Sequence, residues 1–301
     1  MNGVIVVDKP QGFTSFDVVA LMRGLAKERK IGHTGTLDPM ATGVLPLLLG
    51  KAAKAASLLP DTEKAYQAAF LLGQRFDTGD VTGRLLQTDP TPVPRPLLEQ
   101  ALPGFLGDIL QVPPMYSAVS VNGQRLYKLA RQGVEVERPA RPVHISRLVL
   151  ESYDETTRQG VLSVSCSQGT YIRTLIEDIA QAAGTLGAMS ALRRTQACGF
   201  PADAALPLPR LRQLAAENRL AEALLPTAAL FQAYPATTVT QGQAVRFCNG
   251  GSLDLARLPL PKTALSPGQR FRVLGPAGAF LGLAEAQPAT GQLKFLKLFA
   301  E

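Results

Sequence analysis

The segment KIGHTGTLDPMATG, residues 30–43, constrains the fold of this chain more than any other stretch of it. It contains three glycines, three threonines and a single carboxylate, and it precedes the apolar run of residues 44–49. Glycine admits backbone conformations closed to other residues, and Pro39 pushes Asp38 towards extended backbone. An isolated Asp-Pro pair is usually a surface turn. In this glycine-rich context the sequence instead predicts a sharply defined loop that fixes the direction of the Asp38 carboxylate.

Hydrophobic spacing predicts a helix before this loop and an alternation of strands and helices after it. Thr14 and Asp17 have the spacing of a capping box, and the apolar residues that follow at helical intervals are Phe16, Val19, Met22, Leu25 and Ala26. Farther along, the patterns predict strands over 64–72, 143–150 and 161–166, one near Leu85, a hairpin turn at Asn122-Gly123, and helices over 96–105, 125–132, 172–183 and 211–225. Together these elements indicate a mixed α/β sheet rather than a doubly wound parallel one.

The pattern changes beyond Tyr234. Short strand patterns at residues 270–274, 279–283 and 293–298 are separated by proline and glycine turns, as in a small β-barrel. A chain of 301 residues is also long enough for roughly two domains of about 150 residues each. We therefore expect two domains, residues 1–233 and residues 234–301.

The charge balance favours a polyanionic partner. Lys and Arg number 31 and Asp and Glu 24, which gives a net charge of +7. A merely basic protein fits the charge equally well. The basic residues Lys51, Lys54, Arg125, Lys128 and Arg131, with Tyr127 among them, either follow a phosphate backbone or form solvated helix faces.

Several function classes lose support from the sequence. The three cysteines have no CxxC spacing and the chain has only two histidines, so we expect no disulfide framework, no metal site and a reducing compartment. The N-terminal apolar run is too short for a signal peptide, and no stretch approaches the ~20 apolar residues of a membrane helix. A cytoplasmic protein is predicted. Sequence motifs of nucleotide-cofactor sites and of common hydrolases are absent.

Arg173 is a second candidate for chemistry. It lies in the first turn of the predicted helix over 172–183, where a cation meets the positive end of the helix dipole. That unfavourable position calls for an anionic partner. The partner is either Glu177, one turn along the same helix face, or a buried carboxylate such as Asp38, or a substrate phosphate.

Two further residues have an ordinary and a functional interpretation. Tyr66, within the predicted strand over 64–72, is either a core residue or a stacking surface for an extruded base, with a phenol able to exchange a proton. His33, beside the glycine-rich loop, is either structural or a polar contact to substrate. The sequence leaves both choices open.

At these residues the chain resembles the TruB-type tRNA pseudouridine synthases. The matching segments follow the family's order and are residues 3–10, 30–43, 64–66, 77–80, 111–118, 127–133, 169–174 and 192–194. The run GHTGTLDPMATGVLP is the most specific of them. One position departs from the family's pattern, because Ser120 stands where a lysine usually follows the Ser-Ala pair.

The resemblance implies an α/β, more closely α+β, fold. It predicts a pseudouridine synthase domain with a mixed, largely antiparallel sheet flanked by helices, and a small C-terminal PUA-like β-barrel that binds RNA. The implied reaction is the isomerisation of uridine 55 in the T-loop of tRNA to pseudouridine, with no cofactor. The implied partner is the T-arm of tRNA, without an obligate protein partner, and we expect a monomer.

The resemblance also assigns roles. Asp38 is the implied catalytic carboxylate, Arg173 keeps it ionised, and Tyr66 stacks on the flipped base and takes the proton from C5. The implied substrate contacts are His33, Asp80, Leu192, Lys9 and Tyr171.

Two alternatives remain open. One is an RNA-binding or tRNA-folding protein whose main role does not depend on catalysis, and the joint presence of Asp38, Tyr66 and Arg173 argues against it. The other is the guide-RNA-dependent branch, which resembles dyskerin and relies on partner proteins and a longer C-terminal region. The small C-terminal module favours a stand-alone enzyme.

Overall fold

The computed structural model describes residues 1–60, 62–121, 123–260 and 265–300 of the chain. Its main feature is a sheet of ten strands, which run in the order β14 (Leu206–Pro207), β1 (Gly3–Lys9), β3 (Thr42–Leu49), β12 (Gly187–Ala197), β4 (Lys64–Leu72), β11 (Gln159–Cys166), β10 (Arg141–Asp154) and β7 (Gly107–Gln111), with β2 (Ile31–His33) beside β3 and β13 (Phe200–Pro201) beside β12. Only the β1–β14 and β3–β12 pairs are parallel. The sheet is therefore mixed and largely antiparallel, which confirms the predicted fold class.

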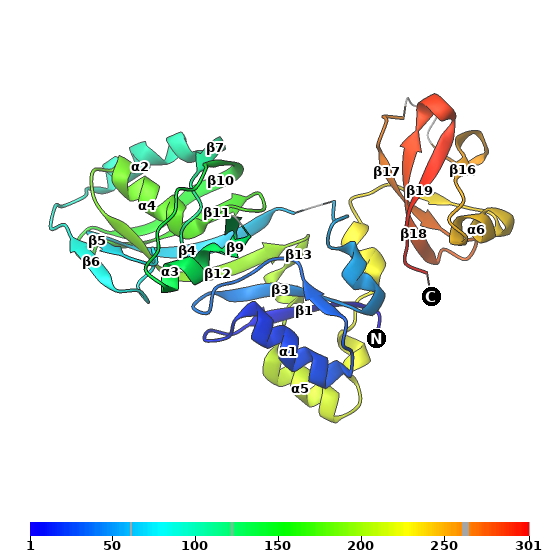
Figure 1. Ribbon diagram of the computed structural model, residues 1–301, viewed down its shortest axis with the longest axis horizontal. Helices are drawn as coiled ribbons and strands as arrows, with labels where there is room; N and C mark the ends of the chain where they lie inside the picture. The colour runs from blue at the N-terminus through cyan, green and yellow to red at the C-terminus, as the bar shows by residue number, and fades with distance from the viewer. Residues whose placement is uncertain (61, 122, 261–264, 301) are drawn as a thin grey trace.

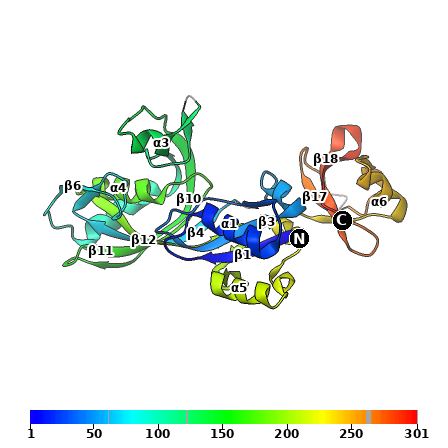
Figure 2. The ribbon, with the colours of Figure 1, turned by 60° about the horizontal axis from the view of Figure 1, so that its bottom comes forward.

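Helices cover one face of this sheet (Figure 1). They are α1 (Ser15–Ala26), α2 (Arg95–Ala101), α4 (Ile172–Ala182) and α5 (Leu208–Ala216). Apolar side chains of all four enter one continuous core with the strands beneath them. The short α3 (Leu126–Arg131) instead stands away from the sheet, on the segment between β7 and β10 (Figure 2). Among the described residues, no helix is both long enough and apolar enough to cross a bilayer.

Helix α1 begins where its sequence predicts. The Thr14 hydroxyl accepts a hydrogen bond from the Asp17 backbone N–H, and the Asp17 carboxylate accepts one from the Thr14 N–H, so the capping box is complete. The predicted apolar face is partly wrong, because Phe16 is 64% exposed and Val18 is buried in its place. Position 16 lies in the first turn of α1, where the Arg23 guanidinium stacks over the exposed Phe16 ring.

Other boundaries follow from local backbone chemistry. The helix expected over 96–105 divides into α2 and a 3₁₀ turn at Leu102–Phe105, because Pro103 lacks the N–H that α-helix geometry needs. The helix expected over 211–225 ends at Ala216 and is followed by a separate 3₁₀ turn, Leu220–Ala223. Two small hairpins complete the fold, β5 (Gln74–Phe76) with β6 (Leu85–Thr88) and β8 (Ser120–Val121) with β9 (Gln124–Arg125). In the predicted turn of the second hairpin, Asn122 lies outside the described residues.

The large sheet has a seam between β3 and β12. These strands pair through two positions only, Arg193 with Thr42 and Arg194 with Gly43. Gly43 has φ +102° there, and a Cβ atom on it would lie 2.1 Å from the carbonyl oxygen of Arg194. Only glycine allows so close an approach of the two backbones. The glycine-rich loop of residues 34–41 emerges at this seam, between β2 and β3.

The C-terminal region forms its own sheet. Its five strands run in the order β15 (Ala236–Thr238), β17 (Arg270–Leu274), β18 (Phe280–Gln287), β19 (Gln292–Leu298) and β16 (Leu253–Asp254), and α6 (Gln241–Cys248) packs against them. This curled sheet is consistent with the predicted PUA-like module. The domain division at residues 233 and 234 stays a prediction.

An aromatic joint connects the two sheets. Phe231 is fully buried, and its ring lies 5.8 Å from that of Phe280 and 5.4 Å from that of Phe299, centroid to centroid. These rings share a core with Val4 and Leu48 of the large sheet. In both ribbon views the C-terminal sheet lies beyond the end of β1 and β3 where the N-terminus is found (Figures 1 and 2).

Candidate active site

A pocket of about 630 Å³ opens at the seam of the large sheet. Its walls come from the glycine-rich loop, from β4 and β12, from residues 116–118, and from residues 167–173 at the start of α4. Five segments of the chain thus meet at one point. Of the residues predicted from the sequence, the pocket is lined by His33, Asp38, Tyr66, Tyr171, Arg173 and Leu192.

Asp38 and Arg173 form an ion pair in this pocket. The Nη2 atom of Arg173 lies 3.1 Å from Oδ2 of Asp38. The Asp38 side chain is 38% exposed, whereas that of Arg173 is 7% exposed, so the carboxylate faces the open pocket and the guanidinium lies behind it. The alternative partner Glu177 forms no ion pair with Arg173 in the described part of the chain.

The Arg173 guanidinium is held on every side. Its Nη1 donates to the carbonyl oxygen of Thr78 at 2.7 Å and its Nη2 to that of Tyr116 at 2.9 Å. Its Nε lies 3.9 Å from Oδ2 of the buried Asp80. A cation in the first turn of α4 is unfavourable on its own. These three oxygen atoms, together with Oδ2 of Asp38, offset that cost. Arg173 therefore presents a fixed positive charge to Asp38.

Asp80 supports this arrangement rather than facing the pocket. Its Oδ1 accepts hydrogen bonds from the hydroxyls of Thr78 and Thr82 and from the Thr82 backbone N–H. The same turn is joined to β12, because the Val81 N–H donates to the carbonyl of Met189. Asp80 is not among the residues that line the pocket. Its position is that of a brace for Arg173.

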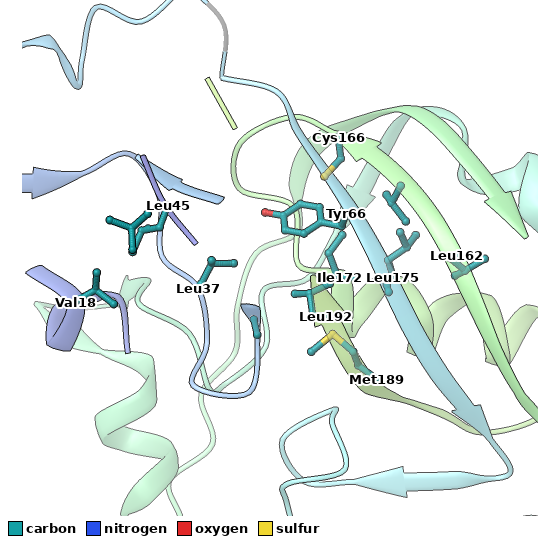
Figure 3. Close-up of a cluster of buried hydrophobic side chains, with 14 of the residues drawn as sticks. Val18, Leu37, Leu45, Tyr66, Leu162, Cys166, Ile172, Leu175, Met189 and Leu192 are labelled. Carbon is teal, nitrogen blue, oxygen red and sulfur yellow. The ribbon is translucent and has the colours of Figure 1, made fainter. Parts of the chain in front are cut away.

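Tyr66 closes the floor of the pocket. It lies on β4 opposite Val164 of β11 and Arg194 of β12, and 8% of it is exposed. Its phenol oxygen points towards the side of Leu37, away from Leu162 (Figure 3). Burial raises the pKa of the Tyr66 phenol to about 12, so the hydroxyl is neutral at physiological pH.

His33 and Lys9 differ in their placement. His33 lines the pocket, its Nδ1 is buried without a hydrogen-bond partner, and burial lowers its pKa, which favours the neutral imidazole. Lys9 is fully buried below the loop and does not line the pocket. Its ammonium donates to the carbonyls of Phe13 and Pro10. This geometry is that of a structural support and not of a substrate contact.

The sequence reasoning missed other residues of the site. Ser117 is buried at the pocket wall with its hydroxyl unpaired, and Tyr116 and Tyr127 line the opening. Arg194 is fully buried beside the loop. A detectable signal for Arg194 was its position in the middle of a buried strand, where a charged residue is unusual.

The chemistry available here is that of a carboxylate beside a partly apolar pocket surface. Asp38 offers a nucleophilic or basic oxygen, Tyr66 and Leu192 offer a flat binding surface, and Arg173 stabilises negative charge. No group of three or more His, Cys, Asp or Glu side chains in the described ranges is arranged to hold a metal ion.

Comparison with known structures and sequences defines the class. The chain superimposes on the proteins in the crystal structure of a Cbf5-Nop10-Gar1 complex and in that of an H/ACA RNP bound to a substrate RNA containing 2′-deoxyuridine. The TM-scores are 0.75 and 0.76, the identities 25% and 22%, and the matches cover 99% of this chain and 84% and 85% of the others. The fold is that of a pseudouridine synthase.

Sequence comparison then gives the family. The TruB family pseudouridylate synthase N-terminal domain matches residues 23–172, and the tRNA pseudouridylate synthase B C-terminal domain matches residues 173–232. A tRNA pseudouridine synthase B of Pseudomonas putida is 45% identical over 86% of this chain and 85% of its own length, and one of Pseudomonas aeruginosa is 42% identical over 95% and 92%. The chain belongs to the TruB family and is an isomerase of the pseudouridine synthase type.

Proposed function

We propose that this enzyme converts uridine 55 in the T-loop of tRNA to pseudouridine, with Asp38 as its catalytic residue. One observation carries the proposal: the Asp38 carboxylate faces the pocket while Arg173 holds it at 3.1 Å from behind. The relatives named tRNA pseudouridine synthase B, which match this chain over most of their length, support tRNA as the substrate. Action on tRNA implies work in the cytoplasm.

The reaction is internally balanced. The N1–C1′ glycosidic bond breaks, a C5–C1′ bond forms, the proton on C5 leaves and N1 gains a proton. No oxidant, reductant or cofactor is consumed. Because the detached uracil must rotate and recombine with the same ribose, the pocket has to retain it and exclude water. The buried walls formed by Tyr66, Leu192 and Ile172 suit that task.

The target nucleotide enters the pocket alone. A volume of about 630 Å³ accommodates a single nucleotide and not a base-paired stem. The uridine therefore has to leave its stack, and Tyr66 provides the surface on which its base stacks. The His33 imidazole and the Ser117 hydroxyl have buried polar atoms without partners at the pocket wall, which a bound nucleotide would satisfy.

Asp38 is suited to the first step. Its carboxylate either adds to the sugar or base or abstracts a sugar proton, and its ion pair with Arg173 fixes its position in all of these routes. Tyr66 lines the pocket in which the base is proposed to bind, and it is proposed to take the C5 proton in the last step. The neutral phenol described above has to lose its own proton before it acts as a base.

The enzyme is proposed to act alone on tRNA, as a monomer. The C-terminal sheet and the basic residues outside the pocket would hold the tRNA by its shape and backbone. Among these residues, Arg131 stacks over Tyr127 at the pocket opening, with its guanidinium 5.6 Å from the ring centroid.

Release of tritium from tRNA labelled at C5 of uridine tests the proposal. The purified enzyme, with no added protein, is expected to release tritium from an unmodified tRNA transcript. Release is expected to vanish when uridine 55 of the T-loop is replaced by cytidine. It is expected to persist when a uridine outside the T-arm is replaced. Release that is unaffected by the T-loop replacement would exclude position 55, and tight binding without any release would favour an RNA-binding protein.

A further inference from the structure

Arg194 is the largest fully buried side chain in the described part of the chain. It lies on β12 at the seam, opposite Tyr66 on one side and Gly43 on the other. Its neighbour Arg193 points the other way, is 40% exposed, and forms a two-bond ion pair with Asp8. Two adjacent arginines thus have different environments, and only Arg194 reaches the pocket region.

The Arg194 guanidinium connects both ends of the glycine-rich loop. Its Nε donates to the carbonyl of Val44 at 2.6 Å, just after the loop. Its Nη2 donates to the carbonyl of Gly35 at 3.2 Å, and its Nη1 lies 3.5 Å from that of Thr36, at the start of the loop. Asp38 lies between these attachment points. The position of the Asp38 backbone therefore depends on the forked, planar guanidinium group of Arg194.

The charge of Arg194 has no carboxylate partner. Within the described residues no Asp or Glu oxygen lies within 4.0 Å of its guanidinium nitrogens, in contrast to Arg173 and Arg193. Burial of an unpaired cation is costly, and an apolar side chain of similar length would fill the same space without that cost. Backbone carbonyl oxygens of the loop region take the place of a carboxylate partner.

Titratable groups lie around Arg194 and around the Tyr66 phenol on which it acts. They are Tyr66 and Lys64 on β4, Cys166 on β11, Asp38 in the loop, Lys9 on β1 and His33 on β2. For the Tyr66 phenol, the Arg194 charge opposes burial and favours the phenolate, whereas Asp38 and Cys166 disfavour it. Arg194 is thus the cation that acts directly on the phenol of the proposed base.

We propose that Arg194 is a positioning residue for the isomerisation, which clamps the Asp38 loop and supplies the positive charge that Tyr66 needs to act as a base. This inference rests on the proposed function. Arg194 does not line the pocket, so its contribution passes through Asp38 and Tyr66 and not through a contact with tRNA. Its loss is therefore expected to lower the rate of the chemical step and to leave tRNA affinity unchanged.

Two substitutions separate the clamp from the charge. Arg194→Lys keeps the positive charge but loses the planar fork that reaches both loop ends. Arg194→Met loses both. Under single-turnover conditions with saturating tRNA, we expect tritium release to slow about tenfold in Arg194→Lys and about 100-fold in Arg194→Met. The apparent Kd for tRNA should stay within about twofold of the wild type in each variant.

The pH profile is the readout that a purely structural role would not change. The phenolate fraction of Tyr66 rises with pH below its pKa of about 12, so the rate should rise with pH wherever proton removal by Tyr66 limits it. We expect this rising limb to extend to higher pH in Arg194→Met and not in Arg194→Lys, because only the first loses the charge beside Tyr66. Arg193→Met is the matched control, since it removes an arginine of the same strand outside the pocket, and its rate and profile should be those of the wild type.

The outcomes are distinguishable. An inactive wild type contradicts the proposed function itself. An active wild type with both Arg194 variants at its rate and profile overturns the inference, as does a loss confined to tRNA affinity. If Arg194→Met does not fold, as judged by circular dichroism, Arg194→Gln replaces it as the neutral variant. If that also unfolds, a full wild-type rate in Arg194→Lys still contradicts the clamp.

Discussion

At the scale of single residues, Asp38 and Arg173 act as one unit. The carboxylate alone would be a half-exposed aspartate in a loop, and the guanidinium alone would oppose the dipole of α4. In the ion pair each side chain supplies the opposite charge that the other lacks. Both were predictable from sequence, because a lone carboxylate in a glycine-rich loop and a cation at a helix N-terminus are each unusual in isolation.

Tyr66 has two proposed roles that one substitution separates. Tyr66→Phe keeps the ring for stacking and removes the phenol. We expect tRNA affinity to stay unchanged and tritium release to fall by about 10²–10⁴-fold, the range of general acid–base catalysis. Single-turnover release measures the effect. Tyr153→Phe is the matched control, because the Tyr153 hydroxyl donates to the carbonyl of Val93 and does not line the pocket. Equal rates of release in wild type and Tyr66→Phe would show that the phenol takes no part in the reaction.

The buried cations were harder to predict than the pocket residues. Arg194 donates to the carbonyl of Val44, 150 residues away in the sequence. Lys9 donates to the nearby carbonyls of Pro10 and Phe13, and its ammonium also lies 3.5 Å from the carbonyl oxygen of the distant Pro39. Nothing in the local pattern of either residue indicates such partners. Lys9 was expected to contact substrate for lack of that information. A sequence shows that a charged residue lies within a strand, but the carbonyls that satisfy it are set by tertiary packing.

At the scale of elements, β1 shows how register places residues. Its odd-numbered residues Ile5 and Val7 enter the helix-covered core, and the even-numbered Val4 and Val6 enter the core shared with the C-terminal sheet. Such a strand reads as a continuous apolar run, and its two faces are not separable from sequence. Lys9, at the end of the strand, continues the odd series and so points beneath the glycine-rich loop.

The Lys9 ammonium at the end of β1 makes the free energy of unfolding depend on pH. Burial lowers its pKa to about 8, while the unfolded chain keeps the proton to about 10.5. The unfolded state then binds more protons above pH 8, so the free energy of unfolding rises with pH. Between about pH 7.5 and about pH 8.5 the Lys9 contribution should grow by about 0.7 kcal/mol.

Urea unfolding at several pH values measures this slope. Lys9→Met should lack it, and the difference between wild type and variant is the quantity to compare. Burial raises the pKa values of Cys166 and Tyr66, so their effects on stability have the opposite sign, but both proteins keep these groups and the effects cancel in the difference. Parallel pH dependences in wild type and Lys9→Met would contradict the buried placement of Lys9.

At the scale of the whole molecule, the aromatic joint connects the catalytic sheet to the C-terminal sheet. Phe231, Phe280 and Phe299 come from three separate segments, and each pattern alone predicts no more than a local core residue. The two sheets were therefore predictable as separate units, whereas their mutual attachment was not. Lys51, interpreted from sequence as a phosphate contact or a solvated residue, is exposed and also donates to the carbonyl of Ala300 at 2.8 Å.

Removal of the Phe231 ring should weaken the packing that connects the large sheet to the C-terminal sheet. Phe231→Ala is expected to destabilise the protein by about 3–5 kcal/mol and to increase amide hydrogen exchange in β1, β3 and β18 together. Phe247→Ala is the matched control, because that ring is fully buried within the C-terminal core only, and it should increase exchange in the C-terminal sheet alone. Unchanged exchange in β1 and β3 of Phe231→Ala would show that the joint carries no coupling.

The central claim is that the Asp38 carboxylate performs the isomerisation in the pocket at the seam. The direct measurement compares wild type with Asp38→Asn, which keeps the size of the side chain and removes its charge. Single-turnover tritium release from C5-labelled tRNA and the Kd of each protein for the same tRNA are measured together. We predict that the rate of tritium release falls by a factor of about 10³ or more while the Kd for tRNA stays unchanged. Release by Asp38→Asn at the wild-type rate would contradict the account.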